Sequence, residues 1–145
     1  MSSLRFLAVA LLVLAPEPFA WTQSSGTTKE RARVTLSTSL PPMDGAHLGA
    51  TVVEVNYGPG ESSPAHRHPC AVIGHVIEGA VRSQVAGEPE STYRTGESFY
   101  EKASGVHVIS ANASQTASAR FVAVLICDHE APISVDVPTT AAKGK

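Results

Sequence analysis

Short apolar segments separated by glycine- or proline-containing turns recur along most of this chain, and this repeat most constrains the fold. The segments follow one another at intervals of about 8–12 residues, and we find no amphipathic helical period of useful length. Regular short strands of this kind are typical of an antiparallel sandwich or barrel. The expected strands are residues 53–57, 71–77, 80–85, 91–94, 98–101, 106–111 and 121–127.

The apolar content of the chain is sufficient for one buried core. Its 145 residues are 43% hydrophobic and 17% charged, with a formal net charge of −2. This charge provides no basic stripe for a phosphate backbone, so we do not expect nucleic-acid binding. No apolar run reaches the roughly 18 residues that a membrane-spanning helix needs. The sequence therefore predicts one all-β domain over residues 41–130.

The beginning of the chain has the pattern of an export signal. A short polar start with Arg5 precedes an apolar run over residues 6–15, and prolines interrupt the chain before Ala20. A packed N-terminal helix or strand is the alternative. We expect a secreted or periplasmic protein. The expected segments are a signal peptide at 1–20, a flexible N-terminal segment at 21–40 and a C-terminal tail at 131–145.

Two histidines that stand one residue apart are the strongest local signal. In an extended chain, residues i and i+2 face the same side, so His66 and His68 can aim at one point while Arg67 faces away. Neutral imidazole is a common ligand for Fe, Cu, Ni and Zn. His107 lies in a later expected strand, which an antiparallel meander can return opposite the pair. These three histidines are the candidate metal ligands, and packed side chains without a metal are the alternative.

The spacing of these histidines resembles that of the cupin superfamily, the small jelly-roll barrels. The first cupin motif contains a glycine, a His-x-His pair and a second glycine, and the second contains a glycine, a histidine and an asparagine. The residues that match the two motifs are Gly60, His66, His68, Gly79, Gly96 and His107, and Asn112 lies one place beyond the expected asparagine. The resemblance covers residues 48–127. It implies an antiparallel jelly-roll barrel in a single domain.

The chain departs from the cupin pattern at one ligand position above all. The glutamate that the family places after the His-x-His pair falls at Val72, so the resemblance implies a three-histidine site without that carboxylate. Lys102 and Ser104 replace the proline and glycine of the second motif. Glu101, six residues before His107, is a candidate fourth ligand or catalytic base, and a solvated strand-end charge is the alternative. A cupin that has lost its metal is a further possibility.

The resemblance also suggests a chemistry. Some three-histidine iron cupins split substrates with O₂, so it implies a small-molecule dioxygenase that uses Fe or Cu, with Ni, Mn and Zn as other metals. The alternatives are a secreted cupin that binds metal or a small ligand without turnover, and a structural or storage protein. The strand at 121–127 is apolar at every position. We therefore expect a homodimer to cover part of its outer side.

The remaining candidates leave alternatives open. Cys70 and Cys127 can form a disulfide, or Cys70 can be a small buried residue or a thiolate ligand. His75 is expected to face away from the histidine pair, and His47 and His129 to lie in loops without a role. Four aromatic residues could line a cavity for an aromatic substrate or belong to the core: Tyr57, Phe99, Tyr100 and Phe121.

Overall fold

Strands are the only regular elements in the part of the chain that the structure describes. The computed structural model describes residues 32–138, so the expected export signal lies outside this range. The strands are β1 (Gly49–Tyr57), β2 (His66–Arg67), β3 (Ala71–Glu78), β4 (Ala80–Val85), β5 (Ser91–Arg94), β6 (Ser98–Glu101), β7 (Val106–Asn112), β8 (Ala119–Cys127) and β9 (Val135–Asp136). The sequence pattern predicts all of them except the two-residue strands β2 and β9. Within residues 32–138 no helix is long and apolar enough to cross a membrane.

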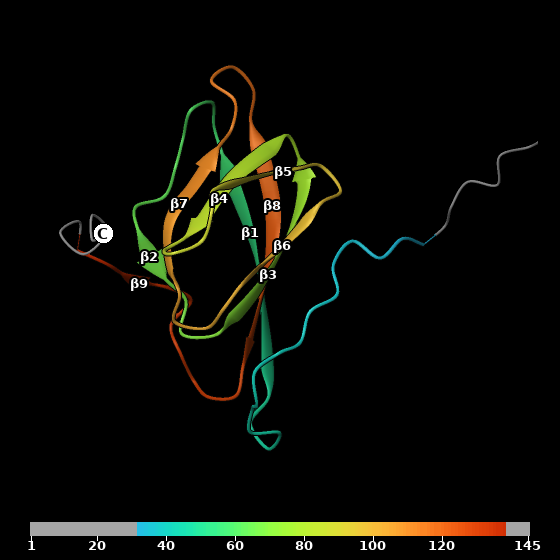
Figure 1. Cartoon of the computed structure of the whole chain (residues 1–145), viewed down its shortest axis with the longest axis vertical. Coiled ribbons are helices and arrows are strands. Elements are labelled where there is room, and N and C mark those ends of the chain that lie inside the picture. The colour runs from blue at the N-terminus through green and yellow to red at the C-terminus, as the bar shows by residue number, and fades with distance from the viewer. Residues whose placement is uncertain (1–31, 139–145) are drawn as a thin grey trace, which may run out of the picture. The chain divides into compact units, whose positions relative to one another are not determined.

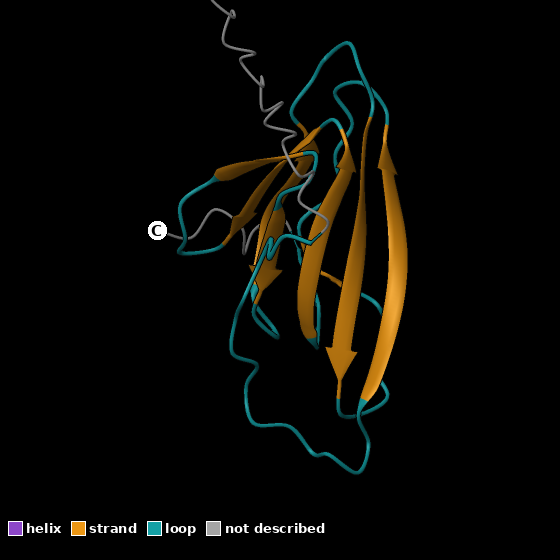
Figure 2. Cartoon of the chain, turned by 90° about the vertical axis from the view of Figure 1, so that its right-hand side faces the viewer, coloured by secondary structure: helices purple, strands orange, loops and turns teal. Residues whose placement is uncertain are grey.

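The strands form two antiparallel sheets that pack face to face (Figures 1 and 2). One sheet has the order β1-β8-β3-β6 and the other has the order β5-β4-β7-β2-β9. Every second side chain of β8 is buried between the sheets, as the two-residue period of a strand requires. The buried core consists of Tyr57, Val72, Val76, Val81, Phe99, Ala119, Phe121, Ala123 and Leu125. The prediction of an all-β antiparallel barrel is confirmed.

A single glycine carries the chain from one sheet to the other. Gly79 joins β3 to β4 and has a φ of 69°, in the left-handed region that favours glycine. A Cβ atom at this position would lie 2.4 Å from the carbonyl oxygen of Ser118. The carbonyl of Gly79 accepts a hydrogen bond from the backbone N–H of Thr95. The turn therefore needs glycine both for its backbone angle and for the close approach of the loop between β7 and β8.

The two cysteines form a disulfide bond. Cys70 precedes β3 and Cys127 ends β8, and these strands are neighbours in the four-stranded sheet. The pairing excludes the alternative of a thiolate metal ligand at Cys70. The cysteines are 57 residues apart in the sequence. By chain entropy, a loop of this length stabilises the folded state by about 4 kcal/mol.

Asn112 has a structural role at the end of β7. Its side-chain nitrogen donates hydrogen bonds to the carbonyls of Gly58 and Ala117, and its oxygen accepts one from the N–H of Ser114. The side chain is buried. Asn112 also begins an Asn-Ala-Ser glycosylation sequence, but the folded chain does not offer this nitrogen for modification because it is buried and hydrogen-bonded.

A close contact between β3 and β6 gives a test of the core packing. Gly74 lies opposite Phe99, and an added Cβ atom would lie 2.1 Å from the ring. We expect Gly74→Ala to lower the free energy of unfolding by about 1–3 kcal/mol, because the buried ring must shift. Gly49→Ala is the matched control, since a Cβ there meets nothing within 4 Å. Urea unfolding of the two variants measures the difference, and equal stabilities would contradict the packing described.

Candidate metal centre

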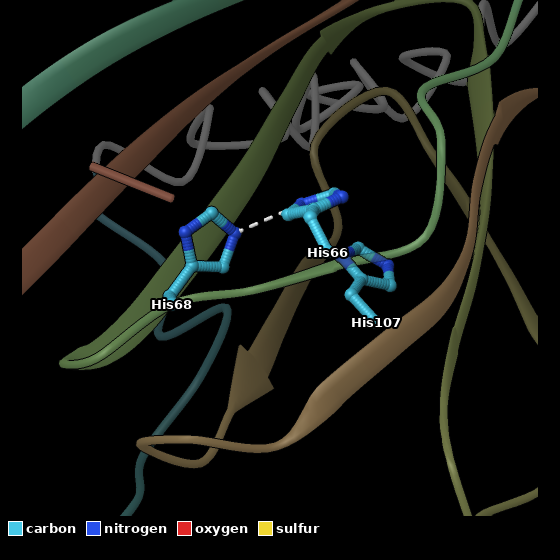
Figure 3. A group of neighbouring side chains, drawn as sticks. All are labelled: His66, His68 and His107. Atoms are coloured by element: carbon cyan, nitrogen blue, oxygen red, sulfur yellow. Dashed lines mark hydrogen bonds between the residues drawn. The ribbon is translucent and has the colours of Figure 1, made fainter. Parts of the chain in front are cut away.

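Strand pairing brings the three predicted ligands together. The short strand β2 pairs with β7 so that His66 lies directly opposite His107, and His68 follows immediately after β2. One ring nitrogen from each histidine lies within 4.8 Å of those of the other two. Figure 3 shows His66 between the other two rings. Arg67 points away and is exposed, as strand alternation predicts.

In each histidine, one ring nitrogen points away from the other two histidines and already has a polar partner. We call this the outer nitrogen and the other the inner nitrogen. Nδ1 of His66 donates to the carbonyl of Pro64 at 2.8 Å, and Nδ1 of His68 donates to the carbonyl of Ile133 at 2.6 Å. Nε2 of His107 lies 3.0 Å from the hydroxyl oxygen of Ser83. Because a carbonyl only accepts, these contacts assign the proton of His66 and His68 to Nδ1. Partners of this kind fix the ring orientation of metal-binding histidines.

The inner ring nitrogens face one another without a suitable partner. Nε2 of His66 and Nε2 of His68 are 3.1 Å apart, although both must carry lone pairs when the rings are neutral. Two acceptors at this distance repel unless a proton or a cation lies between them. Nδ1 of His107 is buried and makes no hydrogen bond within the described residues. Burial lowers the pKa of His66 and thereby favours the neutral form that can bind a metal.

Glu101 joins the cluster from a neighbouring strand. Its Oε2 atom lies 3.2 Å from Nδ1 of His107 and 3.6 Å from Nε2 of His68. Glu101 is only 4% exposed, so the alternative of a solvated strand-end charge is wrong. It lies directly opposite Val72 in the β3–β6 pair. The carboxylate that is missing at Val72 is therefore replaced by one on the next strand, facing the same interior.

The spacing of these atoms fits a transition metal. With metal–ligand distances of about 2.1 Å, ligand atoms lie about 3.0 Å apart at right angles and about 3.5 Å apart in a tetrahedron. Three contacts in the cluster, at 3.1, 3.2 and 3.6 Å, lie near these values. The histidine nitrogens spread over as much as 4.8 Å, so the rings draw closer together when they bind one ion. The donors are three imidazoles and one carboxylate, which suits Fe, Cu, Ni, Mn and Zn alike. The residues present therefore fit a divalent ion, and they do not select which one.

A β-bulge aims two residues of β7 into the same interior. His107 pairs with Val85 and Ile109 pairs with Gln84, so Val108 is the extra residue. In a regular strand, residues three apart face opposite sides. Because of the bulge, both His107 and Ser110 are buried inside. Bulges of this kind occur next to active sites, where they redirect a side chain.

The cluster opens onto a small cavity. The cavity has a volume of about 70 Å³, far below the roughly 300 Å³ of a site for a drug-sized ligand. Its polar lining residues are the three histidines, Glu101, Tyr57, Ser63 and Ser110. The apolar residues that line it are Val53, Val55, Val72, Phe121, Ala123, Leu125 and Ile133. Such a space holds a compact molecule.

The segment after β8 contributes to the centre. Its residue Ile133 lines the cavity and supplies the carbonyl that holds His68. The following strand β9 pairs with β2, with Asp136 opposite His66, and the N–H of Val137 donates to the carbonyl of Ala65. The histidine strand β2 is thus held from both sides. We call residues 128–138 the C-terminal strap.

The other predicted candidates lie elsewhere. His75 is on the outer side of β3 and bonds to the hydroxyl of Ser98, while His47 and His129 are exposed and bond to Asp44 and Asp128. Of the four aromatic residues, Tyr57 and Phe121 line the cavity and Phe99 belongs to the core. Ser83 and Ile133, which contact His107 and His68, could not be identified from the sequence. A lone serine carries no such signal, and Ile133 acts through a backbone atom.

Comparison with known proteins identifies the fold. The cupin domain family matches residues 53–125 of the chain. A cupin-like protein from Thermotoga maritima is 19% identical, with a TM-score of 0.53, and the match covers 61% of this chain and 64% of that chain. No curated protein matches the chain at a significant level.

Two further solved structures are enzymes of different kinds. A DMSP lyase from Ruegeria pomeroyi is 21% identical, with a TM-score of 0.50, and the match covers 68% of this chain and 46% of that chain. An oxalate oxidase in complex with the substrate analogue glycolate is 18% identical, with a TM-score of 0.51, and the match covers 82% and 75%. The matches thus span less than two thirds of the Thermotoga and Ruegeria proteins. At these identities the likeness shows the fold alone.

The C-terminal strap gives a test of how His68 is positioned. Deleting residues 131–145 removes the Ile133 carbonyl and β9, and we expect it to weaken Ni²⁺ binding at least about tenfold, as loss of a ligand's outer partner does. Deleting residues 139–145 alone keeps both features and is the matched control. Titration of each protein with Ni²⁺ measures the affinity, with circular dichroism to verify the fold. Equal affinities in the two folded variants would show that the strap does not position His68.

Proposed function

Because the chain belongs to the cupin family, and because three histidines and a buried carboxylate converge beside a cavity, we propose that it binds one divalent transition metal. We further propose that it is a small-molecule oxygenase of the dioxygenase type that uses Fe or Cu. Either ion, when bound, supplies redox and Lewis-acid chemistry with positions left for small ligands. The protein's own residues then hold the ion, limit the size of the substrate and exclude water.

One observation carries the metal proposal. All three outer ring nitrogens are engaged, while the three inner nitrogens converge on one another and on the Glu101 carboxylate, and within the described residues Nδ1 of His107 makes no hydrogen bond. An ordinary buried histidine hydrogen-bonds through the nitrogen it presents to the interior. Here a cation is the partner that satisfies all three at once. Glu101 adds one negative charge, which offsets half the charge of a divalent ion.

The small cavity supports a compact substrate for the proposed oxygenase. A space of about 70 Å³ admits little more than two water-sized groups, since a water molecule occupies roughly 30 Å³. Glu101 is the candidate base, because it is the carboxylate within contact distance of the cluster. The solved relatives include an oxidase and a lyase. The fold is therefore compatible with more than one reaction, and the choice of oxygen chemistry rests on the resemblance of the three histidines to those of iron cupins that split substrates with O₂.

A non-catalytic binding module is the second candidate function. The same cluster and cavity can hold a metal and a small ligand without turnover. The metal identity separates the two, because Zn²⁺ has no redox chemistry. Iron or copper in the purified protein, at about one per chain, supports the oxygenase. Zinc alone would favour the module.

The proposed ligands can be tested by metal content. We expect His66→Ala and His107→Ala each to lower metal affinity more than about a hundredfold, because loss of a ligand exceeds loss of its outer partner. His75→Ala is the matched control, since this histidine lies on the outer side of β3. Elemental analysis after dialysis against a chelator gives the occupancy. Full metal content in the His66 and His107 variants would disprove the site.

The role of Glu101 can be tested by moving the carboxylate. Glu101→Val should weaken metal binding, and Val72→Glu added to that variant should restore it, because the two positions lie opposite each other in the β3–β6 pair. The double variant keeps the composition of the core unchanged. Failure of Val72→Glu to restore affinity would mean that residue 72 does not face the metal.

We also propose that the chain is exported to an oxidising compartment, secreted or periplasmic, after removal of residues 1–20. The disulfide between Cys70 and Cys127 supports this proposal, because disulfides persist in such compartments.

We propose in addition that the chain forms a homodimer through the outer side of β8 and β1. Val124 and Ile126 are half-buried there, beside the exposed side chains of Val52 and Leu48. Apolar residues gathered on a sheet face are a common sign of an interface.

One experiment tests export and dimerisation together. Native mass spectrometry of the protein recovered outside the cytoplasm should give twice the mass of a chain that lacks about 20 residues. An intact Met1 would contradict removal of the signal. A strict monomer at about 100 µM would contradict the dimer, because an interface of ordinary size holds at that concentration.

A further inference from the structure

Three hydroxyl groups form a second polar element of the cavity. The hydroxyl of Tyr57 lies 2.6 Å from that of Ser63 and 2.8 Å from that of Ser110. All three residues line the same cavity as the histidine cluster. Tyr57 and Ser110 are buried, and the bulge at Val108 is what turns Ser110 inward. We call these three residues the hydroxyl triad.

The hydroxyl triad has one hydrogen more than its two internal hydrogen bonds use. Three hydroxyls carry three hydrogens, and the two hydrogen bonds among them use two. The three side chains bond only to one another within the described residues. Whichever way the bonds are directed, one hydrogen is left over. Depending on that direction it sits on Tyr57, Ser63 or Ser110, so the triad can adjust its donor to a bound acceptor.

We propose that the hydroxyl triad is the subsite for an oxygen of the ligand, and that the ligand is a compact monocarboxylate. This inference rests on the proposed metal site. Three neutral imidazoles, one Glu101 carboxylate and a divalent ion sum to a charge of +1, which a monoanion neutralises. A carboxylate has two acceptor oxygens, one for the ion and one for the free hydroxyl hydrogen.

The rest of the cavity limits the ligand to a small size. Its volume of about 70 Å³ leaves space for a molecule the size of acetate and excludes an aromatic acid. The rest of the lining is aliphatic or aromatic, with Val53, Val55 and Leu125 among the residues. They offer no partner for a second charged group. The ligand's remaining atoms are therefore few and apolar.

Acetate is the probe for this subsite. We expect it to bind the metal-loaded full chain in isothermal titration calorimetry at neutral pH, and benzoate, a monoanion of larger size, to bind much more weakly. Tyr57→Phe combined with Ser63→Ala and Ser110→Ala removes every hydroxyl hydrogen and should weaken acetate binding about tenfold, as loss of a hydrogen bond to a charged group does, whereas Ser110→Ala alone leaves one free hydrogen on the Tyr57–Ser63 pair and should change it little. Metal content should be unchanged in both variants. Tyr100→Phe is the matched control, because Tyr100 does not line the cavity.

The outcomes separate the subsite from the metal site. A wild-type chain that binds no metal would overturn the proposed function and this inference with it. A metal-loaded chain that binds no acetate, or binds benzoate equally well, would overturn the compact monocarboxylate. Unchanged acetate affinity in the triple variant, with full metal content, would overturn the hydroxyl triad alone. Tyr57→Phe keeps the ring beside Phe121, and the two serine replacements each remove one oxygen atom, so circular dichroism verifies the fold of the triple variant.

Discussion

The candidate metal centre depends on the pairing of a strand only two residues long. Strand β2 has β7 on one side and β9 on the other. His66 lies directly opposite His107 in the first pairing and opposite Asp136 in the second. Two residues form too few hydrogen bonds to keep a strand in place by themselves. Their position is set by the neighbours, so the geometry of the histidines reflects the order of the whole five-stranded sheet.

Glu101 shows how a carboxylate can reach the same interior from a neighbouring strand. Residues directly opposite on neighbouring antiparallel strands have Cβ atoms about 4.5–5.5 Å apart. A side chain lost at Val72 can therefore be replaced from Glu101 with little change in where its oxygens reach. Three histidines and one carboxylate thus share the interior although residue 72 is apolar. A motif read along one strand misses such an exchange between strands.

The local features of the fold could be predicted from sequence, and the features set by tertiary contacts could not. The strand pattern and the His66–His68 pair depend on the two-residue period of a strand, which is visible in the sequence. The burial of Glu101 depends on its register with Val72, and the sequence leaves that open. The bulge at Val108 has no glycine to mark it. The carbonyl of Ile133 is a backbone atom, and no residue type reveals its partner.

The disulfide changes how far apart two parts of the metal centre are along the chain. His68 and the Ile133 carbonyl that holds it are 65 residues apart in sequence. Cys70 lies just after His68 and Cys127 shortly before Ile133, so the path through the bridge includes only about eight residues. The entropic free-energy cost of closing the shorter loop is about 2 kcal/mol lower. This corresponds to a roughly twentyfold higher effective concentration of the Ile133 carbonyl near His68. After any local opening, a strap tethered in this way returns to His68 as a near neighbour.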